Sequence, residues 1–161
     1  MTNILIYWRD YKRNLPEQAF RWHSNAGLLG KLEPGDRLWM VTSGANVRHE
    51  AKQAGFLVAI WKVKEVIANP GDDPDYPSGD YRFRVVTDDK ASITFEEPVP
   101  VDHILRPPGR DKAVSIGRFL QGPRKLTDEK VRLLRAAAGP DLALKWLVGG
   151  RRAEDRGQKN G

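Results

Sequence analysis

The sequence predicts a small α+β fold: a strongly bent sheet or small β-barrel, flanked by helices and followed by a basic helical extension. Three observations lead to this class. Short apolar or alternating segments separated by turns fill residues 1–105, a pattern typical of small barrels and bent sheets. The composition shifts at Arg106, after which the chain is basic and its patterns are helical. A length of 161 residues suits one compact domain with such an appendage.

The beginning of the chain predicts a strand and then a helix. Residues 4–8 are a short apolar run typical of a buried strand. Asn14 offers a helix N-cap, and Leu15, Ala19 and Trp22 share one face of the helix that would follow.

The middle of the chain predicts further strands and one short polar helix. That helix spans residues 45–54 and ends at Gly55, whereas Pro34-Gly35 and Asp88-Asp89 are typical of turns. Apolar runs and alternating patterns predict strands over residues 38–41, 56–67, 81–87, 92–95 and 99–105.

Domain boundaries follow from composition. We expect a barrel over residues 1–105, a basic helical extension packing on it over 106–148, and a disordered polar tail over 149–161. In the extension, Thr127 is a helix N-cap and Gly139 a helix stop, and a second helix is expected over 141–148.

Charge is distributed unevenly along the chain. Residues 1–105 hold 13 Lys and Arg against 15 Asp and Glu, a net charge of −2, whereas residues 106–161 hold 14 against 6, a net charge of +8. Such asymmetry indicates a polyanionic partner, most simply nucleic acid, although a solvated basic tail would have the same composition.

Several classes of protein are disfavoured. The chain has no Cys, which excludes disulfides, thiolate zinc sites and a cysteine nucleophile. No apolar stretch approaches the length of a membrane span, and the N-terminus lacks the basic start of a signal peptide. We therefore expect a cytoplasmic protein with no membrane partner.

Catalytic motifs are scarce. His23, His49 and His103 are scattered without metal-ligand spacing, and there is no Walker loop, GxGxxG or GxSxG motif. We expect no cofactor, no metal and no catalytic residues. Triads assemble in space rather than in sequence, however, so an enzyme stays open, with His23 beside Asp10 or Glu17 as its candidate groups.

Aromatic and basic residues gather in the first forty positions. Within Arg21-Trp22-His23-Ser24-Asn25, a Trp offers a stacking surface, and Ser and Asn offer groups that can read a base edge. Such a pocket could hold a base flipped from a duplex. Core packing explains Trp22 equally well, since it shares the predicted helical face.

The order of elements resembles the EVE-type branch of the PUA-like superfamily, kin to YTH and ASCH domains. The resemblance covers residues 3–105 and rests on four phrases. These are Asn3-Ile4-Leu5-Ile6-Tyr7-Trp8, Trp22-His23-Ser24-Asn25, the Pro34-Gly35-Asp36 entry to Leu38-Trp39-Met40, and the apolar residues 55–66. The polar segment 44–54 departs from the pattern, which puts the rim of the expected pocket in doubt.

The resemblance implies a PUA-like barrel that recognises a modified base in an aromatic pocket. Carried over residue by residue, Trp22 and Ser24 line that pocket, Trp39 is its second wall, and Trp8 and Asn25 are neighbours. Phosphates would be held by Arg9, Lys12, Arg13, Arg106 and Arg110.

Three functions follow as hypotheses. The first is a non-catalytic reader of a modified base, with DNA favoured over RNA by analogy with EVE-type partners of restriction systems, which would add a partner nuclease. The second is an ASCH-like enzyme acting on RNA or a nucleotide derivative. The third is a general RNA-binding or protein-interaction module.

Overall fold

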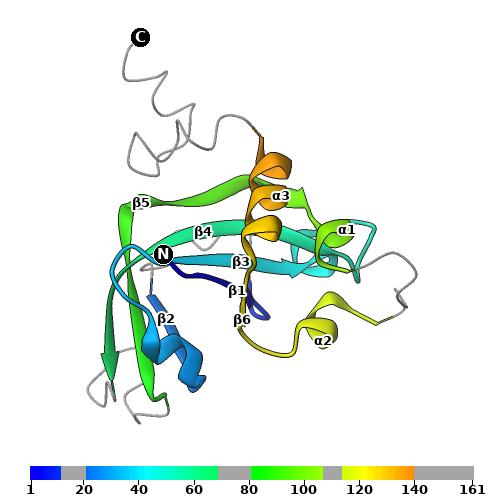
Figure 1. Cartoon of the computed structure of the whole chain (residues 1–161). Helices are drawn as coiled ribbons and strands as arrows, with labels where there is room; N and C mark the ends of the chain where they lie inside the picture. Colours follow the sequence, from blue (N-terminus) through cyan, green and yellow to red (C-terminus); the bar gives the residue numbers. More distant parts are fainter. Residues whose placement is uncertain (12–20, 69–80, 107–113, 140–161) are drawn as a thin grey trace.

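The computed structural model describes residues 1–11, 21–68, 81–106 and 114–139. These residues form a curled six-stranded sheet, about half of a barrel, with a few helices packed against it (Figure 1). The predicted α+β class and bent sheet are confirmed. In chain order the elements are β1 (Asn3–Tyr7), β2 (Arg21–Ser24), η1 (Gly27–Lys31), β3 (Arg37–Ser43), η2 (Gly44–Val47), β4 (Gly55–Ala68), β5 (Phe83–Pro100), α1 (Asp102–Leu105), α2 (Ile116–Leu120), β6 (Arg124–Lys125) and α3 (Asp128–Ala138).

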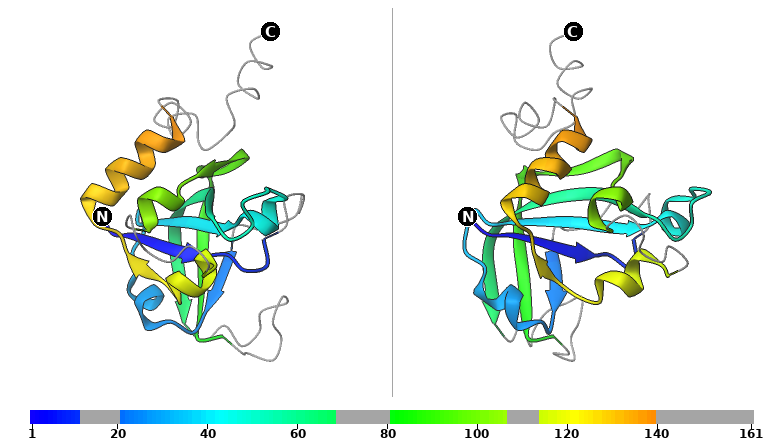
Figure 2. Two further views of the ribbon diagram at one scale, coloured as in Figure 1. Left: turned by 90° about the vertical axis from the view of Figure 1, so that its right-hand side faces the viewer. Right: turned by 45° about the vertical axis from the view of Figure 1, so that its right-hand side comes forward.

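The sheet has the strand order β2-β5-β4-β3-β1-β6, and of these pairs only β1 and β3 run parallel. The two longest strands, β4 and β5, have 14 and 18 residues. Their pairing shifts register at three places, and each irregularity bends the strands and increases their twist. As a result, β2 and the first half of β5 run steeply across the direction of β1 and β3 (Figure 2).

The two faces of the sheet carry two separate hydrophobic cores. On β3, Leu38 and Met40 belong to the first core, whereas Trp39 and Val41 belong to the second. This alternation follows from the pleat, which points successive side chains to opposite faces. The second core is covered by the helices that follow β5, and it includes Leu134 of α3.

A buried carboxylate joins the start of β1 to the turn before β3. Asp36 Oδ1 accepts a hydrogen bond from the backbone N–H of Thr2 at 2.7 Å, and its Oδ2 accepts one from the N–H of Glu33 at 2.8 Å. Gly35, at φ 96°, supplies the left-handed conformation that this turn requires. The Pro34-Gly35-Asp36 phrase therefore positions two neighbouring strands.

Residues 114–139 of the basic C-terminal part belong to the same body as the sheet. β6 pairs antiparallel with Ile4 and Leu5 of β1. Thr127 caps α3 as predicted, its Oγ1 accepting from the N–H of Lys130 at 3.2 Å, and α3 ends before Gly139. The predicted helix over 141–148 and the tail over 149–161 lie outside the described residues. Among the helices in the described ranges, none combines the length and apolarity that crossing a membrane requires.

Three secondary-structure predictions are wrong. Trp22 lies on β2, so it does not share a helical face. Residues 83–100 form one strand followed by α1. The Asp88 carboxylate accepts from the N–H groups of Lys90 and Ala91, and pairing with β4 resumes at Ile93 after a register shift. Residues 45–54 are helical only in η2, since Arg48 adopts φ 58° and ends the turn.

Candidate functional site

Aromatic rings connect strands that lie far apart in the sheet. The ring of Trp8, just after β1, packs edge-on against three others: Tyr11 at 5.1 Å, Trp22 at 5.9 Å and Trp61 at 5.3 Å between centroids. Because β2 is the first strand in the order and β1 the fifth, the contact of Trp8 with Trp22 brings the two sides of the curl together. We call these four residues the aromatic seam.

Burial distinguishes one member of the aromatic seam. Trp8 and Tyr11 are each 5% exposed and Trp61 is 1% exposed, whereas Trp22 is only half-buried. The indole N–H of Trp61 also donates to Thr94 Oγ1 at 3.3 Å, which fixes that ring. Trp22 is therefore the most exposed ring of the aromatic seam, and Trp8 packs edge-on against it.

Ser24 and Asn25 lie at the end of β2, close in sequence to Trp22. Ser24 Oγ accepts from the N–H of Ala26 at 3.0 Å, and Asn25 Oδ1 accepts from the N–H of Arg82 at 2.9 Å. These bonds shape the turn into η1 and join it to the residues before β5. The Ser24 hydroxyl hydrogen and the Asn25 amide hydrogens are the donors that this turn offers.

Trp39 does not join the predicted pocket. Its side chain is fully buried in the second core, and its indole N–H donates to Asn3 Oδ1 at 2.9 Å. The reason is strand parity: Leu38 and Met40 face the core that contains Trp8, so Trp39 between them faces the other side. The expectation that Trp39 is the second wall is corrected, since Trp8 is the ring in contact with Trp22.

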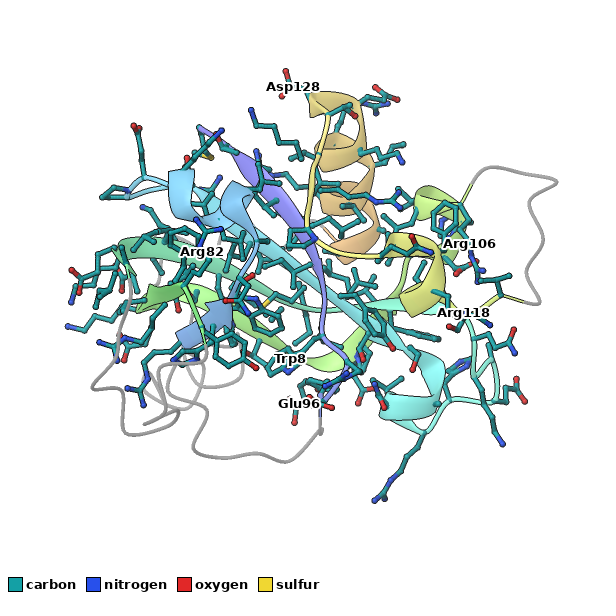
Figure 3. The ribbon with its side chains drawn as sticks, turned by 90° about the horizontal axis from the view of Figure 1, so that it is seen from below. Trp8, Arg82, Glu96, Arg106, Arg118 and Asp128 are labelled. Carbon is teal, nitrogen blue, oxygen red and sulfur yellow. The ribbon has the colours of Figure 1, made fainter. Side chains whose placement is uncertain are left out.

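Arg106 is not available to phosphate. It is 2% exposed, and its guanidinium bonds Asp102 Oδ1 at 2.8 Å, the carbonyl oxygen of Gln53 at 3.2 Å and that of Val114. In Figure 3 it is labelled beside Arg118, on the other side of Trp8 from Arg82. The predicted phosphate role of Arg106 is therefore corrected to that of a buried clamp between α1 and two loops.

Arg9 has the exposure that a phosphate contact needs. Its side chain is 83% exposed and lies 3.4 Å from Asp10, whose hydrogen bond and negative charge raise the pKa of Arg9. A permanently charged guanidinium is therefore carried by the residue that directly follows Trp8 of the aromatic seam. The other predicted phosphate ligands, Lys12, Arg13 and Arg110, lie outside the described residues.

Of the candidate catalytic groups, the structure describes His23 and Asp10. The ring of His23 lies 5.7 Å from that of Tyr81, and the Asp10 carboxylate lies against Arg9. Glu17 lies outside the described residues. Within the described ranges, no group of three His, Asp or Glu side chains could hold a metal ion.

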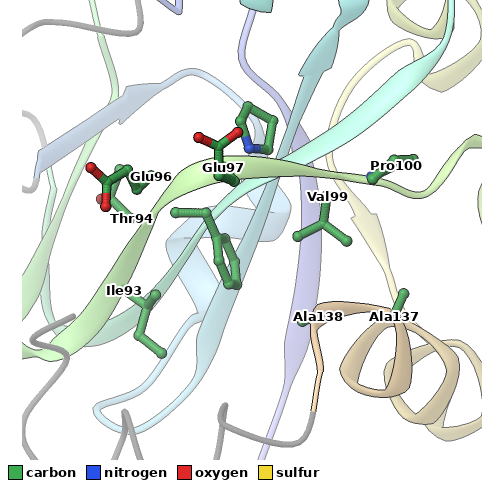
Figure 4. Close-up of a pocket in the computed structure, with 10 residues that line it drawn as sticks. Ile93, Thr94, Glu96, Glu97, Val99, Pro100, Ala137 and Ala138 are labelled. Carbon is green, nitrogen blue, oxygen red and sulfur yellow. The ribbon is translucent and has the colours of Figure 1, made fainter. Parts of the chain in front are cut away.

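Two hollows lie away from the aromatic seam. One, of about 460 Å³, lies between the second half of β5 and the last turn of α3, and Glu96, Glu97 and Val99 line it (Figure 4). The other, of about 540 Å³, lies between residues 49–56 and α1 and includes His49 and His103. Of the predicted site residues, only Arg106 lines either hollow.

Two residues beside the seam escaped the sequence analysis. Asn46 Nδ2 donates to the carbonyl oxygen of Arg9 at 2.9 Å, and Thr42 Oγ1 donates to that of Trp8 at 2.8 Å. The sequence signal for Asn46 is the unexpected polarity of residues 44–54, whereas Thr42 lies on β3 and has no such signal.

Comparison with known proteins identifies no family for this chain. No protein-family model matches this chain, and no curated protein matches its sequence.

Proposed function

We propose that this chain is a non-catalytic nucleic-acid-binding module that holds a flipped, modified base against Trp22. The observation that carries the proposal is the half-buried ring of Trp22, packed edge-on by Trp8 at 5.9 Å and 87°. A rigid, partly exposed indole is a stacking surface for any base, and each such stack contributes about 1–3 kcal/mol. Ser24 and Asn25 would supply donors to the base edge.

Charge and shape support a polyanionic ligand. Arg9 is exposed beside the seam, and Arg82 is exposed where its backbone bonds Asn25. The curled half-barrel is compatible with a PUA-like fold of the EVE type. On this proposal the ligand is modified DNA rather than RNA, met in the cytoplasm, and a partner nuclease would act on the DNA that is bound.

The test is a fluorescence-anisotropy titration of the full chain with labelled oligonucleotides. Matched DNA duplexes would be unmodified, cytosine-modified or adenine-modified, with single-stranded RNA counterparts at the same salt concentration. We expect one modified oligonucleotide to bind more tightly than its unmodified match. Binding should also fall steeply with salt, because phosphate contacts release counterions.

Trp22→Ala should lower affinity for the preferred oligonucleotide by about tenfold, the loss expected when one base no longer stacks on a ring. Trp22→Phe is the matched control, since it keeps an aromatic face and should retain most of the preference. Weak, salt-sensitive binding should survive in both variants. A preference that persists in Trp22→Ala contradicts the pocket assignment.

The two rival functions predict other outcomes of the same titration. Equal affinity for modified and unmodified oligonucleotides indicates a general RNA-binding or protein-interaction module. Cleavage of the labelled RNA indicates an ASCH-like enzyme.

A further inference from the structure

The polar segment after β3 is folded by its own hydrogen bonds. The N–H of Gly44 donates to the carbonyl of Ala54 at 2.9 Å, and that of His49 donates to the carbonyl of Gly44 at 2.8 Å. At its far end, the guanidinium of Arg106 bonds the carbonyl of Gln53. Residues 44–54 are therefore held at both ends, and a side chain in this segment can serve as a fixed anchor for its neighbours.

Asn46 directs its amide at the chain that follows β1. Nδ2 donates one hydrogen to the carbonyl oxygen of Arg9 at 2.9 Å and the other to Thr42 Oγ1 at 2.8 Å. Thr42, which is fully buried, passes its own hydroxyl hydrogen to the carbonyl oxygen of Trp8 at 2.8 Å. One amide and one hydroxyl thus fix two successive carbonyl groups, and we call them the Thr42–Asn46 network.

The donors of this network cannot be exchanged. The Thr42 hydroxyl has a single hydrogen, which it gives to Trp8, so it accepts from Asn46 and cannot donate to it. A carbonyl oxygen in the place of Asn46 Nδ2 would face two acceptors. An amide at position 46 and a hydroxyl at position 42 are therefore both required for the observed geometry.

The Thr42–Asn46 network fixes the backbone of Trp8, the central ring of the aromatic seam. The backbone N–H of Trp8 donates to the carbonyl of Val41 at 2.8 Å, so with the bond from Thr42 both backbone polar groups of Trp8 are bound to β3. Fixing the Trp8 backbone fixes the indole that packs against Trp22. Fixing the Arg9 carbonyl fixes the backbone position from which the exposed Arg9 side chain extends.

We infer that Asn46 and Thr42 are positioning residues of the base pocket, which act through Trp8 and Arg9 without touching the ligand. The inference rests on the proposed function, since it gives these contacts a ligand to serve. It gives residues 44–54, which depart from the EVE-type pattern, a function in the pocket. Through Asn46, this segment aligns the ring of Trp8 and the guanidinium of Arg9 beside the stacking surface of Trp22.

The experiment combines two isosteric substitutions with two readouts. Asn46→Asp replaces the amide by an acceptor-only carboxylate, and Thr42→Val removes the hydroxyl while keeping the shape. Thr42→Ser retains the hydroxyl and is the matched control. Each protein is titrated with the modified and unmodified oligonucleotides, and the ¹⁹F resonance of Trp8 is recorded in 5-fluorotryptophan-labelled protein, assigned by Trp8→Phe.

We expect both isosteric variants to shift the Trp8 resonance and to lose about tenfold in affinity for the preferred oligonucleotide, as for a lost base stack. Thr42→Ser should do neither. Leu134→Ala lowers stability from the opposite face of the sheet, so it should leave the Trp8 resonance and the preference unchanged. This control separates positioning from a general loss of stability.

The inference is overturned if Asn46→Asp and Thr42→Val keep the preference of the unsubstituted chain. It is also overturned if Leu134→Ala, matched in melting temperature, loses the preference to the same extent. If the unsubstituted chain shows no preference for a modified oligonucleotide, the proposed function fails. The ¹⁹F measurement alone then tests whether Asn46 and Thr42 position Trp8. An unmoved Trp8 resonance then overturns the positioning role, and a moved one supports it.

Discussion

Trp39 and Trp22 are the same residue type on strands of one sheet, yet the fold uses them in opposite ways. Trp39 is on β3, a central strand, with its ring fully buried and its indole N–H bonded to Asn3. Trp22 is on β2, the first strand in the order, with its ring half-buried and packed against Trp8. The two tryptophans therefore differ in burial with the place of their strands in the curl.

The two cores also differ in how their aromatic residues are exposed. The second core holds side chains such as Leu57, Ile60 and Ile93 beneath the helices that follow β5. The first core contains Trp8, Tyr11 and Trp61, and Trp22 packs against it. We read the fully buried side chains of both cores as the source of stability and the rim of the first core as the proposed place of binding, and each prediction below tests that division.

The largest expected effect is on the second core. Trp39→Ala should lower the free energy of unfolding by about 3–5 kcal/mol, because it removes a buried ring and leaves a cavity among packed neighbours. Urea unfolding followed by circular dichroism measures the loss. Trp22→Ala, on a half-buried ring, should cost clearly less. Equal costs for the two variants would contradict the division between buried core and rim.

A smaller loss of stability, about 3 kcal/mol, is expected for Arg106→Met, because it leaves the largely buried Asp102 carboxylate without its cationic partner and with the N–H of Gly55 as a remaining donor. The same urea titration measures it. The dependence of oligonucleotide binding on salt, measured well below the unfolding transition, should not change. A weaker salt dependence with unchanged stability would restore Arg106 to the phosphate ligands.

Much of the fold could be predicted from the sequence. The strands at residues 3–7, 37–43 and 55–68 and the capped helix α3 follow from local patterns: apolar runs, a Pro-Gly turn and an N-cap. The continuity of β5 could not be predicted, because Asp88-Asp89 is typical of a turn. The bonds from the Asp88 side chain to Lys90 and Ala91 are local, and only the pairing with β4 on both sides of this register shift makes β5 one strand.

The candidate site was predictable only in part. Trp22, Ser24 and Asn25 are neighbours in sequence, so a motif can find them. The partner of Trp22 depends on how the sheet curls and on the parity of β3, and this is why Trp39 was expected where Trp8 lies. The predicted phosphate role of Arg106 is wrong because the sequence shows a basic residue at a composition boundary but not its buried ion pair with Asp102.

The smallest expected effect concerns Arg9. Arg9→Ala should leave the melting temperature unchanged, since an ion pair as exposed as that with Asp10 adds little stability. If Arg9 holds one phosphate, the slope of log affinity against log salt should fall by about 0.9, the contribution of one phosphate contact to duplex DNA. Anisotropy titrations at several salt concentrations measure the slope.

Arg132 is the matched control for Arg9. It is also an exposed arginine in a surface pair, with Glu129 at 2.7 Å, and that carboxylate raises the pKa of Arg132 as Asp10 does that of Arg9. Arg132 lies on α3, whose apolar residues pack on the second core, so Arg132→Ala should leave the salt slope unchanged. Equal reductions in both variants would mean that phosphates are held over the whole basic surface, and the cation beside Trp22 would then have no special role.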